Sequence, residues 1–201
     1  CSIREFMGDS VIADIEKGQL ESTELPVRLV LFQGLPKADK MELIIQKSVE
    51  LGAAEIVPVE MTRCVVKLDE KKKKSKLARW QSISESAAKQ SGRTVIPEVK
   101  NVISFGEALK YADSLDLLLV PYECADSLKM LRKKIDEIKP GMSVGIFIGP
   151  EGGYEEKEIE EAKKHGGEIV SLGKRILRTE TAAIAARIWK SGTSRIRPGR
   201  S

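Results

Sequence analysis

A chain of 201 residues with 41% hydrophobic residues has the size and composition of one large globular domain, or of one domain with a fragment of another. Aromatic residues make up only 4% of the chain, which does not favour the stacking platforms that many RNA-binding sheets use. The formal net charge of +4 is compatible with a nucleic-acid partner but is weak support for one.

The cysteines and the single histidine limit the chemistry further. The chain has three cysteines, an odd number, and they show no CxxC spacing; they are Cys1, Cys64 and Cys124. This pattern indicates a reducing compartment and no metal cluster. One histidine, His165, excludes histidine-based triads and most zinc sites, and its place before a glycine pair predicts a cation at a helix C-terminus. No apolar run approaches the ~20 residues of a membrane span and no signal peptide is recognisable, so we expect a cytoplasmic protein.

The first 24 residues differ from the rest of the chain. Short alternation of apolar and polar residues around Gly8 and Gly18 predicts strands of a small β unit. Nothing precedes these strands that could close their sheet, so we expect the chain to begin inside a domain. The organisation that follows is a partial β domain at 1–24 and a main domain at 25–201.

From residue 26 onward, apolar runs alternate with helical patterns. Strands are expected at 27–32, 55–59, 115–120, 143–148 and 168–172, with short extended pieces at 64–66 and 95–97. Helices are expected at 41–51, 71–89, 105–111, 126–138, 154–165 and 181–189. This alternation predicts an α/β domain whose parallel sheet has helices on both faces, with ligands bound beyond the C-terminal ends of the strands.

Two features of the long helix at 71–89 have alternative readings. The four lysines at 71–74 are either a solvated helix face or a patch that contacts phosphates. Trp80, and Trp189 near the end of the chain, are expected to pack in the core or an interface rather than to stack on bases.

A glycine-rich turn follows one of the predicted strands. Gly149–Gly153 (GPEGG) lies between a strand and a helix, which suits the presentation of backbone amides to a ligand. The turn is neither a Walker loop nor a GxGxxG fingerprint, and its alternative reading is a tight turn with a helix cap. Pro121-Tyr122-Glu123 follows another strand end and could contribute to the same site.

The segment 171–183, SLGKRILRTETAA, places aliphatic residues inside a basic loop. Ile176 and Leu177 would each cost roughly 1.5–3 kcal/mol if left in water, so we expect something to cover them. The residues Thr179, Glu180 and Thr181 are expected to begin a helix and to cap its free N–H groups. A covered basic loop that leads into a helix suits a pocket for an anionic or polar ligand; a surface loop with two stray aliphatics is the alternative.

GPEGG followed about twenty residues later by LGKRILRTETA resembles the two signature segments of the RsmE family, the 16S ribosomal RNA uracil-N3 methyltransferases of the SPOUT class. The likeness extends from about residue 25 to 186 and includes LFQGLPKADKMELIIQKSVELGAAEIVPV and KLARWQSISESAAKQSGR. It implies S-adenosylmethionine as methyl donor, a trefoil knot at about 145–190, and usually a homodimer. It also implies that residues 1–24 belong to a PUA-like barrel that helps to hold the rRNA.

The resemblance also implies roles for individual residues. Candidate cofactor-binding residues are Val120, Pro121, Ile148, Gly149, Pro150, Glu151, Gly152, Gly153, Leu172, Gly173, Ile176, Leu177, Arg178, Thr181 and Ala182. Adenine recognition can rest on backbone groups of Leu172 and Leu177. Candidate rRNA contacts are Arg63, Gln90 and Arg93. The alternative for each is a surface side chain that has no role in RNA binding.

Methyl transfer to a uracil nitrogen leaves negative charge on the flanking carbonyl oxygens as the ring loses its proton. Arg178 is the first candidate to stabilise that charge. Glu180 could act as base or orient Arg178, or could simply be an acid at a helix N-terminus. Thr179 or Thr181 could hydrogen-bond the base or cap the helix. The rival functions are ribose 2′-O-methylation, RNA binding without catalysis, and nucleotide-phosphate binding at GPEGG.

Overall fold

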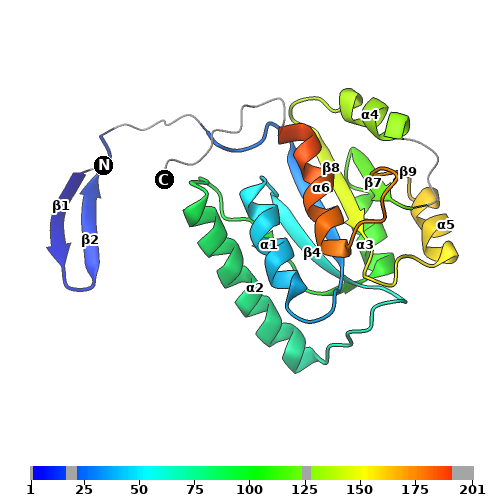
Figure 1. The fold of residues 1–201 in the computed structure, drawn as a ribbon. Coiled ribbons are helices and arrows are strands. Elements are labelled where there is room, and N and C mark those ends of the chain that lie inside the picture. The colour runs from blue at the N-terminus through cyan, green and yellow to red at the C-terminus, as the bar shows by residue number, and fades with distance from the viewer. Residues whose placement is uncertain (1, 17–21, 124–127, 192–201) are drawn as a thin grey trace.

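The computed structural model describes residues 2–16, 22–123 and 128–191 (Figure 1). Its main feature is a seven-stranded sheet in which every pairing is parallel. The strands, in their spatial order, are β5 (Glu98–Val99), β4 (Glu55–Glu60), β3 (Arg28–Gly34), β8 (Ser143–Ile148), β7 (Leu117–Pro121) and β9 (Gly167–Val170), while β6 (Ile103–Ser104) also pairs with β4. The α/β class and the parallel sheet predicted from the sequence are confirmed.

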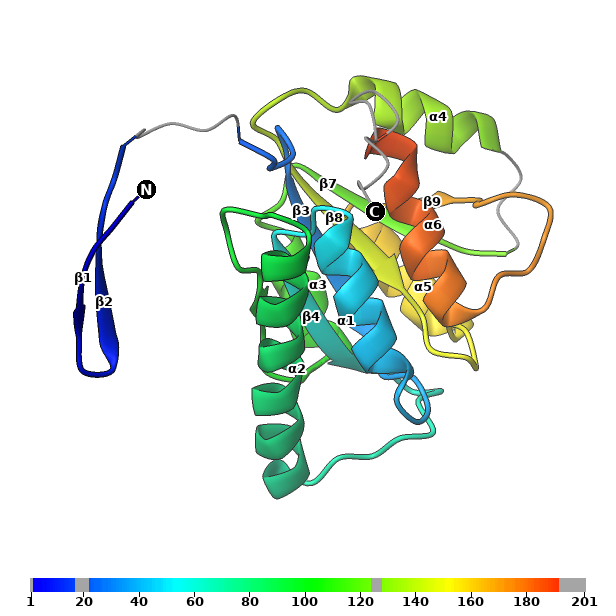
Figure 2. The ribbon, with the colours of Figure 1, turned by 60° about the vertical axis from the view of Figure 1, so that its left-hand side comes forward.

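Helices cover both faces of this sheet, as Figures 1 and 2 show. The three helices that lie side by side on one face are α2 (Glu70–Gln90), α1 (Lys40–Glu50) and α6 (Thr179–Ser191). The helices on the opposite face are α3 (Phe105–Ala112) and α5 (Glu156–Lys164). The remaining helix, α4 (Leu128–Glu137), lies near β9. Within the described ranges, no helix combines the length and the apolar composition that crossing a membrane requires.

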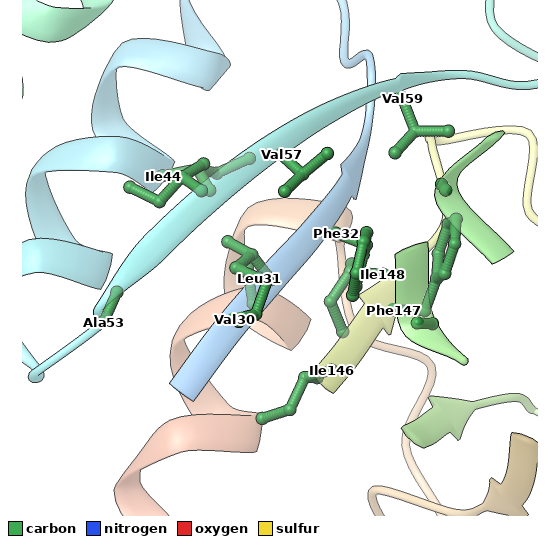
Figure 3. Packing of buried hydrophobic residues seen from close by; sticks show 14 of the residues in the cluster. Val30, Leu31, Phe32, Ile44, Ala53, Val57, Val59, Ile146, Phe147 and Ile148 are labelled. Atoms are coloured by element: carbon green, nitrogen blue, oxygen red, sulfur yellow. The ribbon is translucent and has the colours of Figure 1, made fainter. Parts of the chain in front are cut away.

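The core forms where the central strands meet α1 (Figure 3). Nearly all of β3 is buried, as expected for a strand with helices on both faces, and Phe32 stacks on Phe147 of β8 with ring centroids 5.4 Å apart. On α1, Ile44, Ile45 and Val49 are all fully buried. The helical spacing of these aliphatics in the sequence predicted this buried face, and the structure confirms it.

The N-terminal residues form a β-hairpin that lies apart from the sheet in both views (Figures 1 and 2). Its strands are β1 (Ser2–Met7) and β2 (Ser10–Asp14), which pair antiparallel. The turn uses Gly8 with φ of 57°, a conformation that glycine adopts without penalty. The strands predicted around Gly8 are therefore present, whereas Gly18 lies outside the described residues. Several large apolar side chains of the hairpin, including Phe6 and Ile15, are exposed.

Several local predictions differ from the structure. Residues 64–66 are not a strand, because the chain turns back on itself there and the Cys64 amide bonds the Met61 carbonyl. Residues 95–97 are not a strand either, since the Val95 amide bonds the Glu24 carboxylate and sheet pairing begins only at Glu98. The last strand ends at Val170, and α6 begins two residues earlier than expected.

The long helix α2 is capped by Asp69, whose carboxylate accepts the Lys72 backbone N–H at 2.8 Å. Of the lysine run that follows, Lys73 pairs with Glu60 and Glu70, and the other three are exposed. This agrees with a solvated helix face. Trp80 is 3% exposed and lies in the core as expected, whereas the side chain of Trp189 lies outside the described residues.

Candidate functional site

The parallel register brings the C-terminal ends of four strands to one edge of the sheet. Gln33 of β3 lies opposite Ile148 of β8, and Pro121 of β7 lies opposite Val170 of β9. A cavity of about 520 Å³ opens at this edge, where ligands bind in open parallel sheets. Its wall is formed by Lys40, Arg63, Pro121, Tyr122, Glu123, Ile148, Gly149, Pro150, Glu151, Gly152, Gly153, Tyr154, Glu156, Ser171, Leu172, Gly173, Arg175, Ile176, Leu177, Arg178, Thr179 and Ala182.

The predicted cofactor-binding residues line this cavity apart from two. Val120 is fully buried inside β7, and Thr181 is exposed on α6 outside the wall. The wall also contains residues that the sequence did not indicate, notably Lys40, the first residue of α1, and Tyr154. The position of Lys40 just after a parallel strand was the one sequence signal that could have placed it here.

Close packing around the 149–153 turn explains its glycines. A side chain at Gly149 would lie 3.1 Å from the Tyr154 ring, and one at Gly152 would lie 2.8 Å from Cβ of Arg63. Gly153 has φ of 68°, and its amide bonds the Pro150 carbonyl at 2.9 Å. The turn is therefore a compact unit packed between its neighbours, and the Arg63 guanidinium donates to the Gly152 carbonyl at 3.1 Å.

Tyr154 packs against the 149–153 turn. Its ring is buried against Gly149, and its hydroxyl donates to the Phe147 carbonyl. Burial raises the pKa of Tyr154 well above its ordinary value, with a smaller contribution from the nearby carboxylate of Glu158. The phenol is therefore neutral at physiological pH and acts here as a hydrogen-bond donor.

The second loop, 171–178, forms the facing wall. Leu177 is half-buried, but Ile176 is 84% exposed, so the prediction that both aliphatics are covered is wrong for Ile176. The loop presents Ile176 at the rim of an open cavity rather than to the protein interior. Ser171 stabilises the start of the loop, because its hydroxyl oxygen accepts the Gly173 N–H at 3.2 Å.

Lys40, Glu151 and Glu180 form an ion-paired cluster in and beside the cavity wall. Lys40 Nζ lies 2.9 Å from Glu151 and 3.4 Å from Glu180, so one ammonium serves two carboxylates. Burial pushes the pKa of Glu151 upward, but Lys40 and the Lys37 amide outweigh this effect and hold it below its ordinary value. The guanidinium of Arg178 is exposed in the wall and has no ion pair or hydrogen bond within the described part of the chain.

Two predicted catalytic roles are corrected by these contacts. Glu180 pairs with Lys40, not with Arg178, and it does not line the cavity, so it neither orients that arginine nor faces a substrate there. Thr179 is buried, and its hydroxyl donates to the Gly149 carbonyl at 2.7 Å and accepts from Gln33 Nε2 at 2.9 Å. That hydroxyl is engaged with the glycine turn, so it does not cap its own helix.

The three candidate rRNA contacts fall in different places. Arg63 lies in the cavity wall, whereas Gln90 is exposed at the C-terminal end of α2 and does not line the cavity. The side chain of Arg93 is 5% exposed, pairs with Glu24, and donates to main-chain carbonyls of α1 and the following turn. An rRNA contact for Arg93 is at odds with this burial, because its guanidinium is occupied inside the protein.

Comparisons with known proteins agree with this geometry. The family described as RNA methyltransferase domain matches residues 23–189. Ribosomal RNA small subunit methyltransferase E of Bacillus subtilis is 39% identical over 189 residues, which cover 92% of this chain and 74% of that protein. The chain belongs to the RsmE family.

Solved structures support this membership. The RsmE-family enzyme of Neisseria gonorrhoeae, solved bound to S-adenosylmethionine, is 38% identical with a TM-score of 0.72, covering 85% of this chain and 68% of that one. A Legionella pneumophila protein solved with the same cofactor is 35% identical with a TM-score of 0.76, covering 86% of this chain and 69% of that one. Both cavity loops fall inside the matched range 23–189, and the hairpin lies outside it.

The carboxylates near the cavity do not form a metal site. Within the described residues, no group of three or more His, Cys, Asp or Glu side chains is placed to hold a metal ion.

Proposed function

We propose that this RsmE-family chain transfers a methyl group from S-adenosylmethionine to N3 of a uridine in 16S rRNA of the small ribosomal subunit. The observation that carries the proposal is the cavity between the glycine turn 149–153 and the loop 171–178 at the C-terminal edge of the sheet, with Arg178 in its wall. Its RsmE-family membership and the cofactor-bound relatives support the choice of ligand.

The residues present suit an adenosine-containing cofactor. The cavity volume lies within the range of roughly 300–1,000 Å³ that small-molecule sites occupy. Ile148, Leu172 and Leu177 offer apolar wall for the adenine ring, with neighbouring main chain for its nitrogens. Glu151 and Lys40 place both charges within reach of a zwitterionic amino-acid group. When bound, S-adenosylmethionine supplies a methyl group activated by its sulfonium.

The chain supplies position and charge stabilisation. Uracil N3 becomes nucleophilic when it loses its proton, and the resulting negative charge spreads over the two flanking carbonyl oxygens. Arg178 stabilises this charge, since its guanidinium needs to break no existing ion pair within the described structure. Holding the base in line with the methyl group supplies the remaining advantage.

Replacing Arg178 tests this role. We expect Arg178→Ala to slow methyl transfer by about 10²–10³-fold, the usual effect of removing one charge-stabilising donor, with cofactor affinity near normal. Lys174→Ala is the matched control, because Lys174 is an exposed cation of the same loop that does not line the cavity. Single-turnover transfer and calorimetry with S-adenosylhomocysteine measure the two effects. An equal loss of cofactor affinity in Arg178→Ala would contradict the role.

The product identifies the reaction. The chain is incubated with isotopically labelled S-adenosylmethionine and small-subunit rRNA, free and in particles, and the digested nucleosides are separated by mass spectrometry. We expect labelled N3-methyluridine, whereas a 2′-O-methyl nucleoside would assign the enzyme to ribose methylation. Calorimetry without heat and without competition by S-adenosylhomocysteine would favour an RNA-binding module that has no catalytic activity.

The family resemblance also supplies proposals about assembly. We infer a trefoil knot at about 145–190; in support, the loop 171–178 and the 149–153 turn line one cavity, and α6 returns from the β9 edge to pack on α1. Residues 1–24 are proposed to belong to a PUA-like barrel, which would cover the exposed apolar side chains of the hairpin. A homodimer in the cytoplasm completes the proposal, and light scattering of the purified chain tests the dimer.

A further inference from the structure

Gln33 is a fully buried amide at the C-terminal end of β3. Its exposure is 0%, and it lies in β3 between Phe32 and Gly34. Nε2 donates to the Gly34 carbonyl and to the Thr179 hydroxyl, both at 2.9 Å, whereas Oε1 has no hydrogen-bond partner. An acceptor buried without a partner costs free energy, so stability alone does not account for an amide at this position.

The hydrogen-bond directions around Gln33 are fixed by chemistry. The Gly34 carbonyl can only accept, so the amide nitrogen must face it, and the same nitrogen then donates to Thr179. The hydroxyl proton of Thr179 is left to donate to the Gly149 carbonyl at 2.7 Å. The result is a directed chain of hydrogen bonds, the Gln33–Thr179–Gly149 relay, which joins β3, the start of α6 and the glycine turn.

The relay connects the two walls of the cavity. Thr179 follows Arg178 at the end of the loop 171–178, and Gly149 begins the turn that faces this loop. The Gln33–Thr179 and Thr179–Gly149 hydrogen bonds of the relay span 146 and 30 residues of sequence, so they join segments that only the tertiary structure brings together. Gln33 does not line the cavity, so it acts on a ligand only through these partners.

We propose that Gln33 is a positioning residue for the cofactor site. Through Thr179 it fixes the Gly149 carbonyl and the first turn of α6, and it thereby holds the two cavity walls at the separation that binds the adenosine group. This inference rests on the proposed function for the identity of the ligand. The hydrogen bonds that join the two walls do not depend on which ligand binds.

Four variants test the relay by calorimetry with S-adenosylhomocysteine. We expect Gln33→Met and Thr179→Val each to weaken binding by about 3–10-fold, the effect of one net hydrogen bond. The double variant should be no weaker than either single variant, because both remove the same chain of bonds. Thr179→Ser should retain near-normal affinity, which a purely steric role for Thr179 would not explain. Wild-type affinity in Gln33→Met, or losses that multiply in the double variant, would overturn the proposal.

A matched control separates positioning from general stability. The Ser84 hydroxyl is also buried and donates to a main-chain carbonyl, that of Pro97 at 2.7 Å, but it lies outside the cavity wall. Ser84→Ala should lower the melting temperature without changing cofactor affinity. Gln33→Met removes two hydrogen bonds together with the unpaired acceptor, so its loss of melting temperature should not exceed that of Ser84→Ala. If Gln33→Met does not fold, the Thr179→Val and Thr179→Ser pair decides the proposal.

Hydrogen exchange without any cofactor gives an independent readout. Peptides covering 149–153 and 172–178 should exchange faster in Gln33→Met and Thr179→Val than in the wild type, and at the wild-type rate in Ser84→Ala. Unchanged exchange in both relay variants would overturn the proposal. If the wild-type chain fails to bind S-adenosylhomocysteine, the proposed function is wrong, and the exchange rates alone then decide whether Gln33 holds the two walls.

Discussion

Gly34 lies where the end of β3 touches the glycine turn, and its replacement by alanine tests how tightly that edge is packed. An added Cβ would lie 2.7 Å from both N and Cδ of Pro150 and 2.8 Å from Sδ of Met61. The backbone of Gly34 is not in the left-handed region, so alanine is conformationally allowed. Met61 can move its flexible end, but the Pro150 main chain cannot, and the effect of Gly34→Ala is therefore steric.

The size of the effect follows from these distances. Favourable carbon contacts begin near 3.5 Å, so the turn must withdraw from β3 by about 0.8 Å. Overpacking of this kind costs about 1–3 kcal/mol, and the lower entropy of the unfolded chain returns about 0.4–1 kcal/mol. We therefore expect a net loss of about 0.5–2 kcal/mol in the free energy of unfolding. Because the displaced turn is a cavity wall, cofactor affinity should fall by roughly tenfold or more.

Urea unfolding and calorimetry with S-adenosylhomocysteine measure the two effects of Gly34→Ala. Gly106→Ala is the control, because Gly106 lies in α3 and an added Cβ there meets nothing within 4 Å. That substitution should stabilise the protein by about 0.5–1 kcal/mol and leave affinity unchanged. If Gly34→Ala is as stable as the wild type and binds the cofactor normally, the packing argument for this edge is refuted.

Two further predictions concern the side-chain contacts of Glu24 and Tyr154. Burial raises the pKa of Glu24, but the hydrogen bond and charge of Arg93, with the amides of Val95 and Thr94, outweigh it and hold that pKa below its ordinary value. The stabilisation of the folded state by ionised Glu24 is therefore present above the unfolded-state pKa of about 4.3, and it disappears as pH falls through the folded-state pKa. In urea unfolding, Glu24→Gln should be less stable than the wild type at pH 7. The two proteins should approach the same stability near pH 3. Tyr154→Phe leaves the buried Phe147 carbonyl without its donor and should cost about 1–3 kcal/mol in urea unfolding; an unchanged midpoint would contradict that hydrogen bond.

Secondary structure was predictable from sequence where one side-chain pattern decides it. The apolar run Ser143–Ile148 matches β8 at both ends, and the aliphatic spacing on α1 identifies its buried face. The prediction fails where a partner from another segment decides the structure. Val95 looks like the start of a strand, but its amide is bound by Glu24, and no pattern local to Val95 contains that contact.

The candidate site shows the same division. The two loops were predictable because glycines and a basic aliphatic segment follow strand ends that a parallel sheet must bring together. The partners of individual side chains were not, because they depend on tertiary contacts. Glu180 is adjacent to Thr179 and near Arg178 in sequence, yet its ion pair is with Lys40, from another part of the chain. Arg93 looked like a surface cation, but Glu24 draws it into the interior.

The ion pairs of Lys40 bear on the availability of Arg178, which has no ion pair among the described residues. Both Glu151 and Glu180 are close to the cavity, and either would be a natural ion-pair partner for a guanidinium of the 171–178 loop. Lys40 pairs with both carboxylates, and the loop cations Arg175 and Arg178 have no ion pair within the described residues. An arginine that must first leave a carboxylate would lose part of its binding energy on an anionic substrate. Lys40 thus holds Glu151 and Glu180 on one side of the cavity, which leaves the guanidinium of Arg178 available for the proposed anionic intermediate.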